Sequence, residues 1–199
     1  TTIQPPTEAT IKYSQMEGWQ LVVVGDKKTP HTEYENINCE YLHPDDQEDL
    51  NKELSDTIGW NCIQRRNLGF LYSYLKGAEV MATVDDDNIP YDSWGKEIYV
   101  GNEIEVDLYE SANGYFDPLS VTEHSNLWHR GYPIEMVPSK NNVKHLGTEH
   151  RKVLVQADLW DGDPDIDAIC RLSQQPEVKF KSISPFATRQ LSPFNSQNT

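Results

Sequence analysis

The chain has 199 residues and is strongly acidic, because 17 Lys and Arg residues face 32 Asp and Glu residues and leave a formal net charge of −15. This charge argues against a nucleic-acid backbone or an anionic membrane as the main partner. The 37% of hydrophobic residues, with 5 Trp, 10 Tyr and 5 Phe among them, favours a polar but globular protein over a disordered one. No apolar stretch approaches the ~18–20 residues of a membrane span, which predicts a soluble domain.

The three cysteines, Cys39, Cys62 and Cys170, are odd in number and lack CxxC spacing. This pattern favours free thiols in a reducing compartment, and hence a cytoplasmic location. The length predicts a single domain over residues 1–199. Because the sequence ends at SPFNSQNT with no tapering tail, we expect the domain to be cut from a longer chain.

A short helix and a buried strand are predicted near the start of the chain. Residues 9–16 are expected to form a helix that ends at Gly18. Residues 19–24 form a short β-branched run that Gly25 and Asp26 close, which is typical of a buried, parallel strand. The end of this strand is therefore expected to open onto the loop GDKKTPH.

Two helices and a second strand are predicted next. Acidic residues crowd the first turn after Pro44, as the helix dipole prefers, so a helix is expected to begin there. Apolar residues recur at helical spacing over residues 61–76, and Gly77 is placed to end that helix. Residues 78–84 are then expected to return as a strand, which gives a right-handed crossover in a doubly wound α/β sheet.

The pattern changes after residue 95. Residues 98–100 and 104–109 alternate apolar with polar side chains around Gly101-Asn102, which predicts a small antiparallel hairpin. Residues 110–150 are rich in Asn, Gly, Pro and His and are predicted to form long loops, of the kind that compact domains keep for function.

The end of the chain is predicted to add two strands and one helix. Residues 152–160 are expected to form a strand, and Asp163 and Pro164 to supply the N-cap and first turn of a helix that runs through about Leu172. Residues 178–183 are expected to form the last strand. The predicted fold class is therefore α/β, with a mixed central sheet flanked by helices.

The most informative motif is the acidic run Asp85-Asp86-Asp87, directly after the predicted strand at 78–84. In open α/β sheets ligands bind beyond the carboxyl ends of strands, so these carboxylates lie where a site is expected. Adjacent carboxylates repel one another, and Mg²⁺ or Mn²⁺ together with substrate phosphates would relieve that repulsion. The alternative for such a run is a solvated acidic turn.

Two basic pairs are placed to bind phosphate. Arg65 and Arg66 lie near the start of a predicted helix, and Lys27 and Lys28 lie in the loop after the first strand. Arg side chains match phosphate oxygens and a helix start favours anions, so a diphosphate is the predicted partner of these residues. The alternative is that the four side chains pair with surface acids.

Five motifs in one order resemble the nucleotide-sugar domain of GT-A glycosyltransferases. They are VVVGDKKTP, RRNLGFLYSYLKGA, TVDDDN, RGYP and ADLWDGDPDIDA. Over residues 19–172 and the closing SPFNSQNT, the chain is similar to STELLO-type proteins and, more distantly, to plant reversibly glycosylated polypeptides. It also resembles a GT-A domain within a multi-domain sugar transferase of a large algal virus.

The resemblance implies a GT-A-like fold, with a nucleotide-binding half at 1–95 and an acceptor-binding, catalytic half at 96–199. It implies transfer of a sugar from a nucleotide-diphosphate donor, usually a UDP-sugar, to a hydroxyl of a glycan or glycoconjugate, with Mn²⁺ or Mg²⁺ as cofactor. The metal-site residues that it implies are Asp87, as the direct ligand, and Asp85, as a contact to ribose or to metal-bound water. The donor-binding residues that it implies are Gly25, Asp26, Lys28, Arg65, Asn67, Asp85, Asp86 and Arg130.

The chemistry of such a transfer gives each class of residue a reason. Cleavage at the anomeric carbon places negative charge on the leaving diphosphate, which a cation and an Arg stabilise as it develops. An inverting transfer also needs a carboxylate base, and we expect Asp161, in the turn before the last helix, to be that base and Asp163 to be the second candidate. The alternative is that all the carboxylates of residues 158–167 are structural.

Two other functions stay open. Arg130 aligns with an arginine that becomes sugar-modified in the plant polypeptides, whose relatives interconvert ring forms of a UDP-sugar, so a mutase is one alternative. A non-catalytic acidic Ca²⁺-binding or interaction module is the other. His145 and His150 have no assigned role, because the late histidine ligand of many GT-A enzymes has no clear counterpart here.

Overall fold

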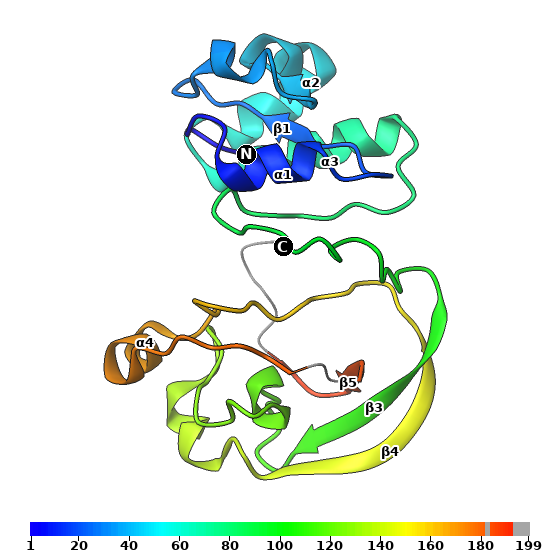
Figure 1. The fold of residues 1–199 in the computed structure, drawn as a ribbon, viewed down its shortest axis with the longest axis vertical. Coiled ribbons are helices and arrows are strands. Elements are labelled where there is room, and N and C mark those ends of the chain that lie inside the picture. The colour runs from blue at the N-terminus through cyan, green and yellow to red at the C-terminus, as the bar shows by residue number, and fades with distance from the viewer. Residues whose placement is uncertain (182–183, 193–199) are drawn as a thin grey trace. The chain divides into compact units, whose positions relative to one another are not determined.

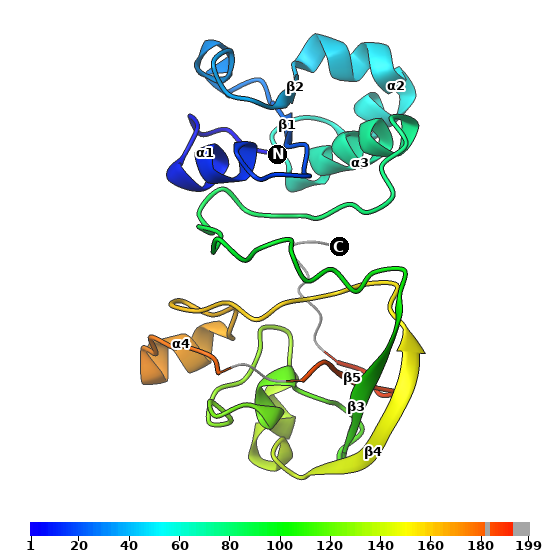
Figure 2. The same cartoon turned by 45° about the vertical axis from the view of Figure 1, so that its right-hand side comes forward.

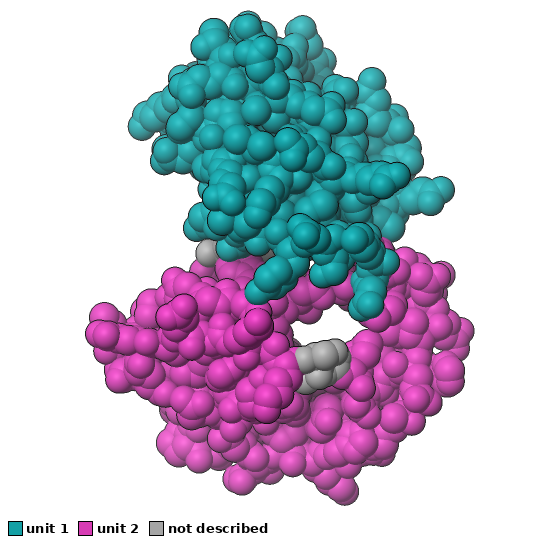
Figure 3. All heavy atoms as spheres, viewed as in Figure 1, with its two compact units in different colours: residues 1–97 teal, residues 98–199 magenta. Residues whose placement is uncertain are grey.

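The computed structural model of the chain describes residues 1–181 and 184–192. The chain divides into two compact units, residues 1–97 and residues 98–199 (Figure 3). Both units combine helices and strands, so the predicted mixed α/β class is confirmed. Across the described ranges the strands form two separate sheets, a parallel pair and a mixed three-stranded sheet, in place of the predicted single central sheet. No helix in those ranges is long and apolar enough to span a bilayer.

Unit 1 combines a two-stranded parallel sheet with three α-helices (Figure 1). Its elements in chain order are α1 (Glu8–Ser14), β1 (Val22–Val24), the 3₁₀ helix η1 (His31–Tyr34), β2 (Glu40–Leu42), α2 (Pro44–Ile58), the 3₁₀ helix η2 (Ile63–Arg65) and α3 (Arg66–Leu75). β1 and β2 run parallel, with Val23 opposite Tyr41. The predicted first helix and the buried parallel strand are therefore confirmed.

Helix α2 begins where the sequence predicts, and its capping explains why. The His43 ring accepts a hydrogen bond from the Asp45 N–H at 3.3 Å, and the Asp46 carboxylate accepts one from the His43 N–H at 2.9 Å. This reciprocal capping box satisfies N–H groups that the first helical turn leaves without partners. Pro44 occupies the first turn, where its missing N–H costs nothing.

Helix α3 packs against β1 through its smallest residue. A Cβ on Gly69 would come within 2.8 Å of a Val24 methyl, so the close approach of helix and strand needs glycine. Leu68, beside it, is fully buried. The predicted helix is confirmed at residues 66–75, and Gly77 follows it with the positive φ expected of a residue that ends a helix.

The strand predicted at residues 78–84 is wrong, because this segment has no secondary structure. β2 pairs with β1 along one edge, and at the end of β1 the Thr2 N–H donates to the Val24 carbonyl at 3.3 Å, beside a parallel bridge between Thr2 and Gly25. Met81 is 45% exposed, so the segment runs over the surface of unit 1 and carries the acidic run with it.

Unit 2 is built on a mixed sheet in the order β4-β3-β5. Its elements in chain order are β3 (Glu103–Ser111), the 3₁₀ helices η3 (Pro118–Val121) and η4 (Ile134–Ser139), β4 (Val143–Lys152), α4 (Ala168–Gln174) and β5 (Phe186–Thr188). β3 and β4 are antiparallel and form one long curved ribbon, which Figures 1 and 2 show from two sides. β5 joins the other edge of β3 in parallel.

The two strands predicted on either side of the loop region are corrected. Residues 98–100 do not pair with β3 as the predicted hairpin requires, since the antiparallel partner of β3 is β4. Gly101 instead turns the chain into β3, with its N–H bonded to the Val153 carbonyl at 2.8 Å. The strand predicted at 152–160 lies earlier, at 143–152, within the region predicted to be loop.

The last predicted elements also shift. Asp167 and not Asp163 caps α4, because its carboxylate accepts the Ile169 N–H at 2.8 Å. Of the strand predicted at 178–183, Val178 makes only an isolated bridge to Gly162, and 182–183 lie outside the described residues. The closing motif SPFNSQNT is described only at Ser192, and its remainder lies outside those residues.

A small apolar core holds the loop region of unit 2 together. It gathers buried side chains from the loops and from α4, with Trp128, Leu159 and Phe180 packed against it. Its buried members are Leu119, Leu127, Ile166, Cys170 and Val178. All three cysteines of the chain are free, as predicted.

Candidate functional site

A pocket of about 300 Å³ lies in unit 1, at the end of β1. Residues 1–3 line one side of it. Asp26 and Lys28, in the loop that follows β1, form the first of two further walls, and residues 61–63, just before α3, form the second. Two of the predicted donor-binding residues thus line one cavity.

Asp26 joins the two walls of the pocket. Its side chain is 1% exposed, and its two carboxylate oxygens accept the Lys27 N–H at 2.7 Å and the Asn61 N–H at 2.8 Å. The Asp26 N–H donates to the Thr29 hydroxyl at 2.7 Å, which closes the turn. Lys28 is exposed at the rim. Asp26 therefore holds the two walls of the pocket together, and the exposed side chain of Lys28 is accessible to an anion at the rim.

Gly25 serves the packing of unit 1. A Cβ at this position would overlap with the Tyr41 hydroxyl and ring. That hydroxyl is held by the His31 ring at 2.6 Å and has little room to move. The glycine in this predicted donor-binding motif is therefore required by its neighbour across the sheet, and its carbonyl is used inside the fold.

The acidic segment, defined as Asp85, Asp86 and Asp87, is tied to the same region of unit 1. The Asp85 carboxylate lies 3.4 Å from the Arg66 guanidinium. The Asp86 carboxylate accepts the hydroxyl of Thr2, a residue that also lines the pocket, at 2.5 Å. Asp87 is exposed. The segment thus lies beside the pocket and one of the two predicted basic pairs.

The surroundings of Asp85 perturb its ionisation. Burial raises the pKa of Asp85, the nearby Arg66 lowers it, and the neighbouring carboxylates of Asp87 and Asp86 raise it. The charged form of Asp85 is therefore under-stabilised by its surroundings. Within residues 1–181 and 184–192, no group of three or more His, Cys, Asp or Glu side chains is gathered to hold a metal. Any ion here would take two protein carboxylates and further ligands from a substrate or water.

The two adjacent arginines differ in position, because Arg65 is buried inside unit 1 and Arg66 lies beside the acidic segment. The prediction that Arg65 binds the donor is therefore corrected. Arg65 is fully buried and donates to groups inside unit 1, so it does not reach the pocket as a donor-binding residue. Arg66, whose side chain is 12% exposed, is the one that meets Asp85. Asn67 is exposed in the first turn of α3.

The remaining predicted residues, Arg130, Asp161 and Asp163, belong to unit 2. The Arg130 guanidinium lies 3.1 Å from the Asp165 carboxylate. The backbone N–H of Arg130 also donates to the backbone carbonyl of Asp165 at 3.1 Å. Asp165 also lies 3.9 Å from the His129 ring. The RGYP loop is therefore fastened to the acidic loop before α4.

Asp161 and Asp163 have different surroundings in that acidic loop. Asp161 is half-buried and accepts the Phe180 N–H at 2.7 Å. Asp163 has a side chain 74% exposed and forms an ion pair with Arg171 of α4. The structure thus assigns both a structural contact, and Asp161 is the better shielded from water.

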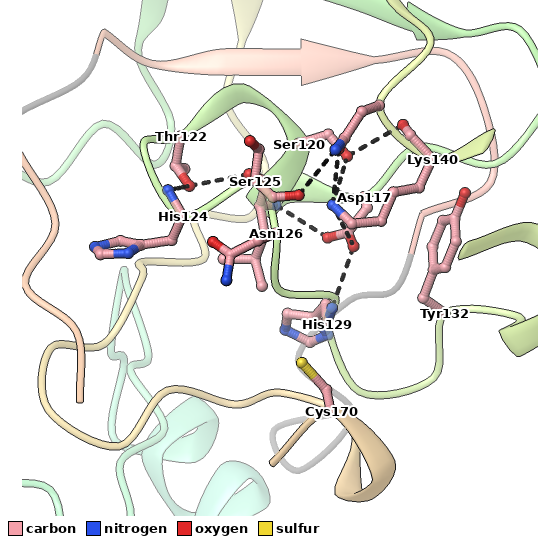
Figure 4. Close-up of polar contacts among 12 residues, drawn as sticks. Asp117, Ser120, Thr122, His124, Ser125, Asn126, His129, Tyr132, Lys140 and Cys170 are labelled. Carbon is pink, nitrogen blue, oxygen red and sulfur yellow. Dashed lines mark hydrogen bonds and ion pairs between the residues drawn. The ribbon is translucent and has the colours of Figure 1, made fainter. Parts of the chain in front are cut away.

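Sequence reasoning missed a buried ion pair in unit 2 (Figure 4). Asp117 is 0% exposed and Lys140 2% exposed, with the ammonium 3.8 Å from the carboxylate. Asp117 also accepts the N–H groups of Leu119 at 3.0 Å and His129 at 3.2 Å. It therefore links the loop that precedes RGYP to the loop that follows it. The one signal available was Asp117-Pro118, a typical start of a short helical turn.

Comparisons with known proteins support the resemblance seen in the motifs. No family model matches the chain. Two proteins of Arabidopsis thaliana, named Probable glycosyltransferase STELLO2 and Probable glycosyltransferase STELLO1, are each 24% identical to it over 220 residues. Each match covers 98% of this chain and 28% of the relative, so the chain spans under a third of their length. The similarity to STELLO-type proteins is confirmed, whereas a viral origin stays a prediction.

Proposed function

We propose that the chain is the donor-binding and catalytic domain of a metal-dependent glycosyltransferase, which moves a sugar from a UDP-sugar to a hydroxyl of a glycan or glycoconjugate. The observation that carries the proposal is the arrangement in unit 1, where the acidic segment meets Arg66 and, through Thr2, the pocket. Similarity over almost the whole chain to two proteins named as probable glycosyltransferases supports the same activity. We also propose that the fold of the chain is GT-A-like.

The pocket and its rim suit the two parts of a nucleoside diphosphate. The pocket combines the apolar side chain of Ile63 with polar groups of Asp26 and Asn61, a mixture that suits a nucleoside. Lys28 and Arg66 supply positive charge for the diphosphate, and an Arg can bind two phosphate oxygens at once. Because the chain as a whole has a net charge of −15, we take these two basic side chains beside the pocket to serve a specific anion.

Asp85 and Asp87 are the proposed ligands of Mn²⁺ or Mg²⁺. The donor set fits these ions, which bind through one or two carboxylates and complete their shell with substrate phosphates and water. Burial raises the pKa of Asp85, and positive charge at this point would favour its ionised form. When bound, the ion would supply charge neutralisation for the leaving diphosphate.

The residues of the chain divide the remaining work. Arg66, which pairs with Asp85, would donate to the diphosphate as its negative charge grows during bond cleavage. In unit 2, Asp161 is the proposed base for an inverting transfer, and Asp163, being largely exposed, is second to it. Arg130 would hold the loop around Asp165.

Calorimetric titration of UDP with and without Mn²⁺ tests the proposal. We expect binding that depends on Mn²⁺ and that Asp87→Asn weakens at least about tenfold, or about 1.4 kcal/mol. Asp92→Asn is the matched control, because it removes one exposed carboxylate from the same unit and leaves the acidic segment intact. UDP affinity that is the same without metal, or the same in the Asp87 variant, would contradict the proposal. Stabilisation by Ca²⁺ with no UDP binding would favour the interaction module instead.

A further inference from the structure

A buried polar bridge lies behind the pocket of unit 1 and contacts the chain next to both of its walls. We propose that Gln47 and Arg65, the two side chains of this bridge, are positioning residues that fix the separation of the walls and so set the affinity for the nucleotide. The inference rests on the proposed function, because it takes the ligand of the pocket to be a nucleoside diphosphate. Neither residue lines the pocket itself.

Gln47 holds the wall that follows β1. It belongs to α2, is 0% exposed, and donates from its amide nitrogen to the carbonyls of Gly25 at 2.7 Å and Leu42 at 2.8 Å. Leu42 is the last residue of β2 and Gly25 directly follows β1, and the Gly25 N–H donates to the Leu42 carbonyl at 3.0 Å. Asp26, the wall residue, follows Gly25 directly in the chain. The amide of Gln47 thereby fixes the point from which this wall departs.

Arg65 holds the opposite wall. One guanidinium nitrogen donates to the Ser55 carbonyl at 3.2 Å, the Ser55 hydroxyl at 3.0 Å and the Gly59 carbonyl at 3.1 Å. The guanidinium also lies 3.6 Å from the centre of the Trp60 ring. Residues 61–63, which form this wall, lie between Trp60 and Arg65 in the chain and are therefore fixed at both ends.

The two halves of the bridge meet at one atom. The side-chain oxygen of Gln47 accepts the Arg65 Nε–H at 3.0 Å and a second guanidinium N–H at 2.5 Å. Gln47 thus uses both its donor and its acceptor, and a shift on either side is transmitted to the other. The Asp26 carboxylate repeats the connection on the pocket side, through the Asn61 N–H at 2.8 Å.

The composition of the bridge argues for a geometric role. The groups that Arg65 contacts directly are an amide, a hydroxyl, two carbonyls and an aromatic ring, all of them neutral, and the Asp26 carboxylate acts on its charge from beyond ion-pair distance. Burial lowers the pKa of Arg65 and the Asp26 carboxylate only partly offsets this effect, so the buried charge costs free energy that an apolar side chain of similar size would avoid. What the guanidinium of Arg65 supplies is fixed distances, and in an enzyme a misplacement of about 1 Å can cost about 10²-fold in rate.

Gln47→Glu separates the two halves of the bridge. A Glu oxygen can still accept from Arg65, and with a full charge, whereas it cannot donate to both strand-end carbonyls as the amide does. The chain is therefore expected to stay folded while the wall after β1 loses its anchor. Ser14→Ala is the matched control, because it removes the hydrogen bond of another buried hydroxyl of unit 1, to the Ile11 carbonyl at 2.7 Å, and leaves the hydrogen bonds of Gln47 and Arg65 unchanged.

The experiment measures UDP affinity by calorimetry in the presence of Mn²⁺, together with the thermal unfolding midpoint of each variant. We expect Gln47→Glu to weaken UDP binding at least about tenfold while remaining folded, and Ser14→Ala to lower the midpoint while changing the affinity less than about twofold. If Gln47→Glu does not fold, Arg65→Lys takes its place: it keeps the charge and releases the wall at 61–63, and the same weakening is expected.

The outcomes separate this inference from the proposed function. A wild-type chain that does not bind UDP contradicts the proposed function, and the positioning role falls with it. A wild-type chain that binds UDP, with a folded Gln47→Glu or Arg65→Lys chain that binds it equally well, overturns only the positioning role. In that case the bridge would serve stability alone, and the midpoints would fall without a change in affinity.

Discussion

Replacement of Lys140 by Met is expected to destabilise unit 2 strongly. The change keeps much of the apolar stem and removes the ammonium that faces Asp117 at 3.8 Å. Asp117 would then be a fully buried carboxylate with only the N–H groups of Leu119 and His129 as donors. Removal of one partner of a buried pair costs about 3–5 kcal/mol, so a loss of this size is expected in the free energy of unfolding.

The pKa values of the pair indicate where the cost comes from. Burial raises the pKa of Asp117 and lowers the pKa of Lys140, so both charged forms are penalised by the fold. Lys140→Met combined with Asp117→Asn removes both charges and is expected to be more stable than Lys140→Met alone. Lys144→Met, at an exposed position of β4, is the control and should change stability by no more than about 0.5 kcal/mol.

Urea unfolding followed by circular dichroism at several pH values provides the measurement. The charge of Lys140 lowers the pKa of Asp117, so this pKa should rise further in the folded state of Lys140→Met. A raised pKa means that stability is lost as pH increases through the folded-state value. The deficit of Lys140→Met should therefore be largest near neutral pH and shrink toward pH 4. A deficit below about 1 kcal/mol, or one that grows in acid, would refute the reasoning.

Two further substitutions in unit 1 test its packing and its electrostatics. Gly25→Ala should cost about 1–3 kcal/mol because its methyl overlaps with Tyr41, and Tyr41→Leu in the same chain should restore part of the thermal midpoint; no restoration would contradict the clash. Burial, with a smaller contribution from Asp85, raises the pKa of Tyr13 to about 12, so stability should fall between pH 10 and pH 12 as the unfolded chain ionises first. Tyr13→Phe should fall less steeply in urea unfolding over that range, and an equal slope would contradict the pKa.

Signals that act over a few residues could be interpreted from the sequence. The β-branched run of β1 and the proline and acids that begin α2 depend on neighbours in the chain, and both elements form as predicted. The pairing of β3 depends on partners far away in the sequence, which alternation of apolar and polar side chains does not identify. The segment at 78–84 contains residues that favour strands, but within residues 1–181 and 184–192 it pairs with no strand. Its local sequence could not reveal this, because pairing depends on distant residues.

The residues of the candidate site, too, could be predicted only in part from local sequence signals. The sequence indicates a basic pair, and only the helical register separates Arg65 from Arg66. Arg65 precedes the buried Leu68 and Gly69 by three and four positions and therefore shares their inward face, a signal that was available. The acidic loop before α4 was harder, since several of its carboxylates can cap a helix and local spacing does not rank them.

The order of the strands in unit 2 also affects how the chain matures as it is synthesised. β3 is the central strand, yet its parallel neighbour β5 follows β3 and β4 in the chain and emerges from the ribosome after both of them. Until then one edge of β3 exposes backbone N–H and C=O groups that can pair with another molecule. At about 5–20 residues per second this interval lasts seconds, so the nascent chain can aggregate through this edge during the time between the synthesis of β3 and that of β5.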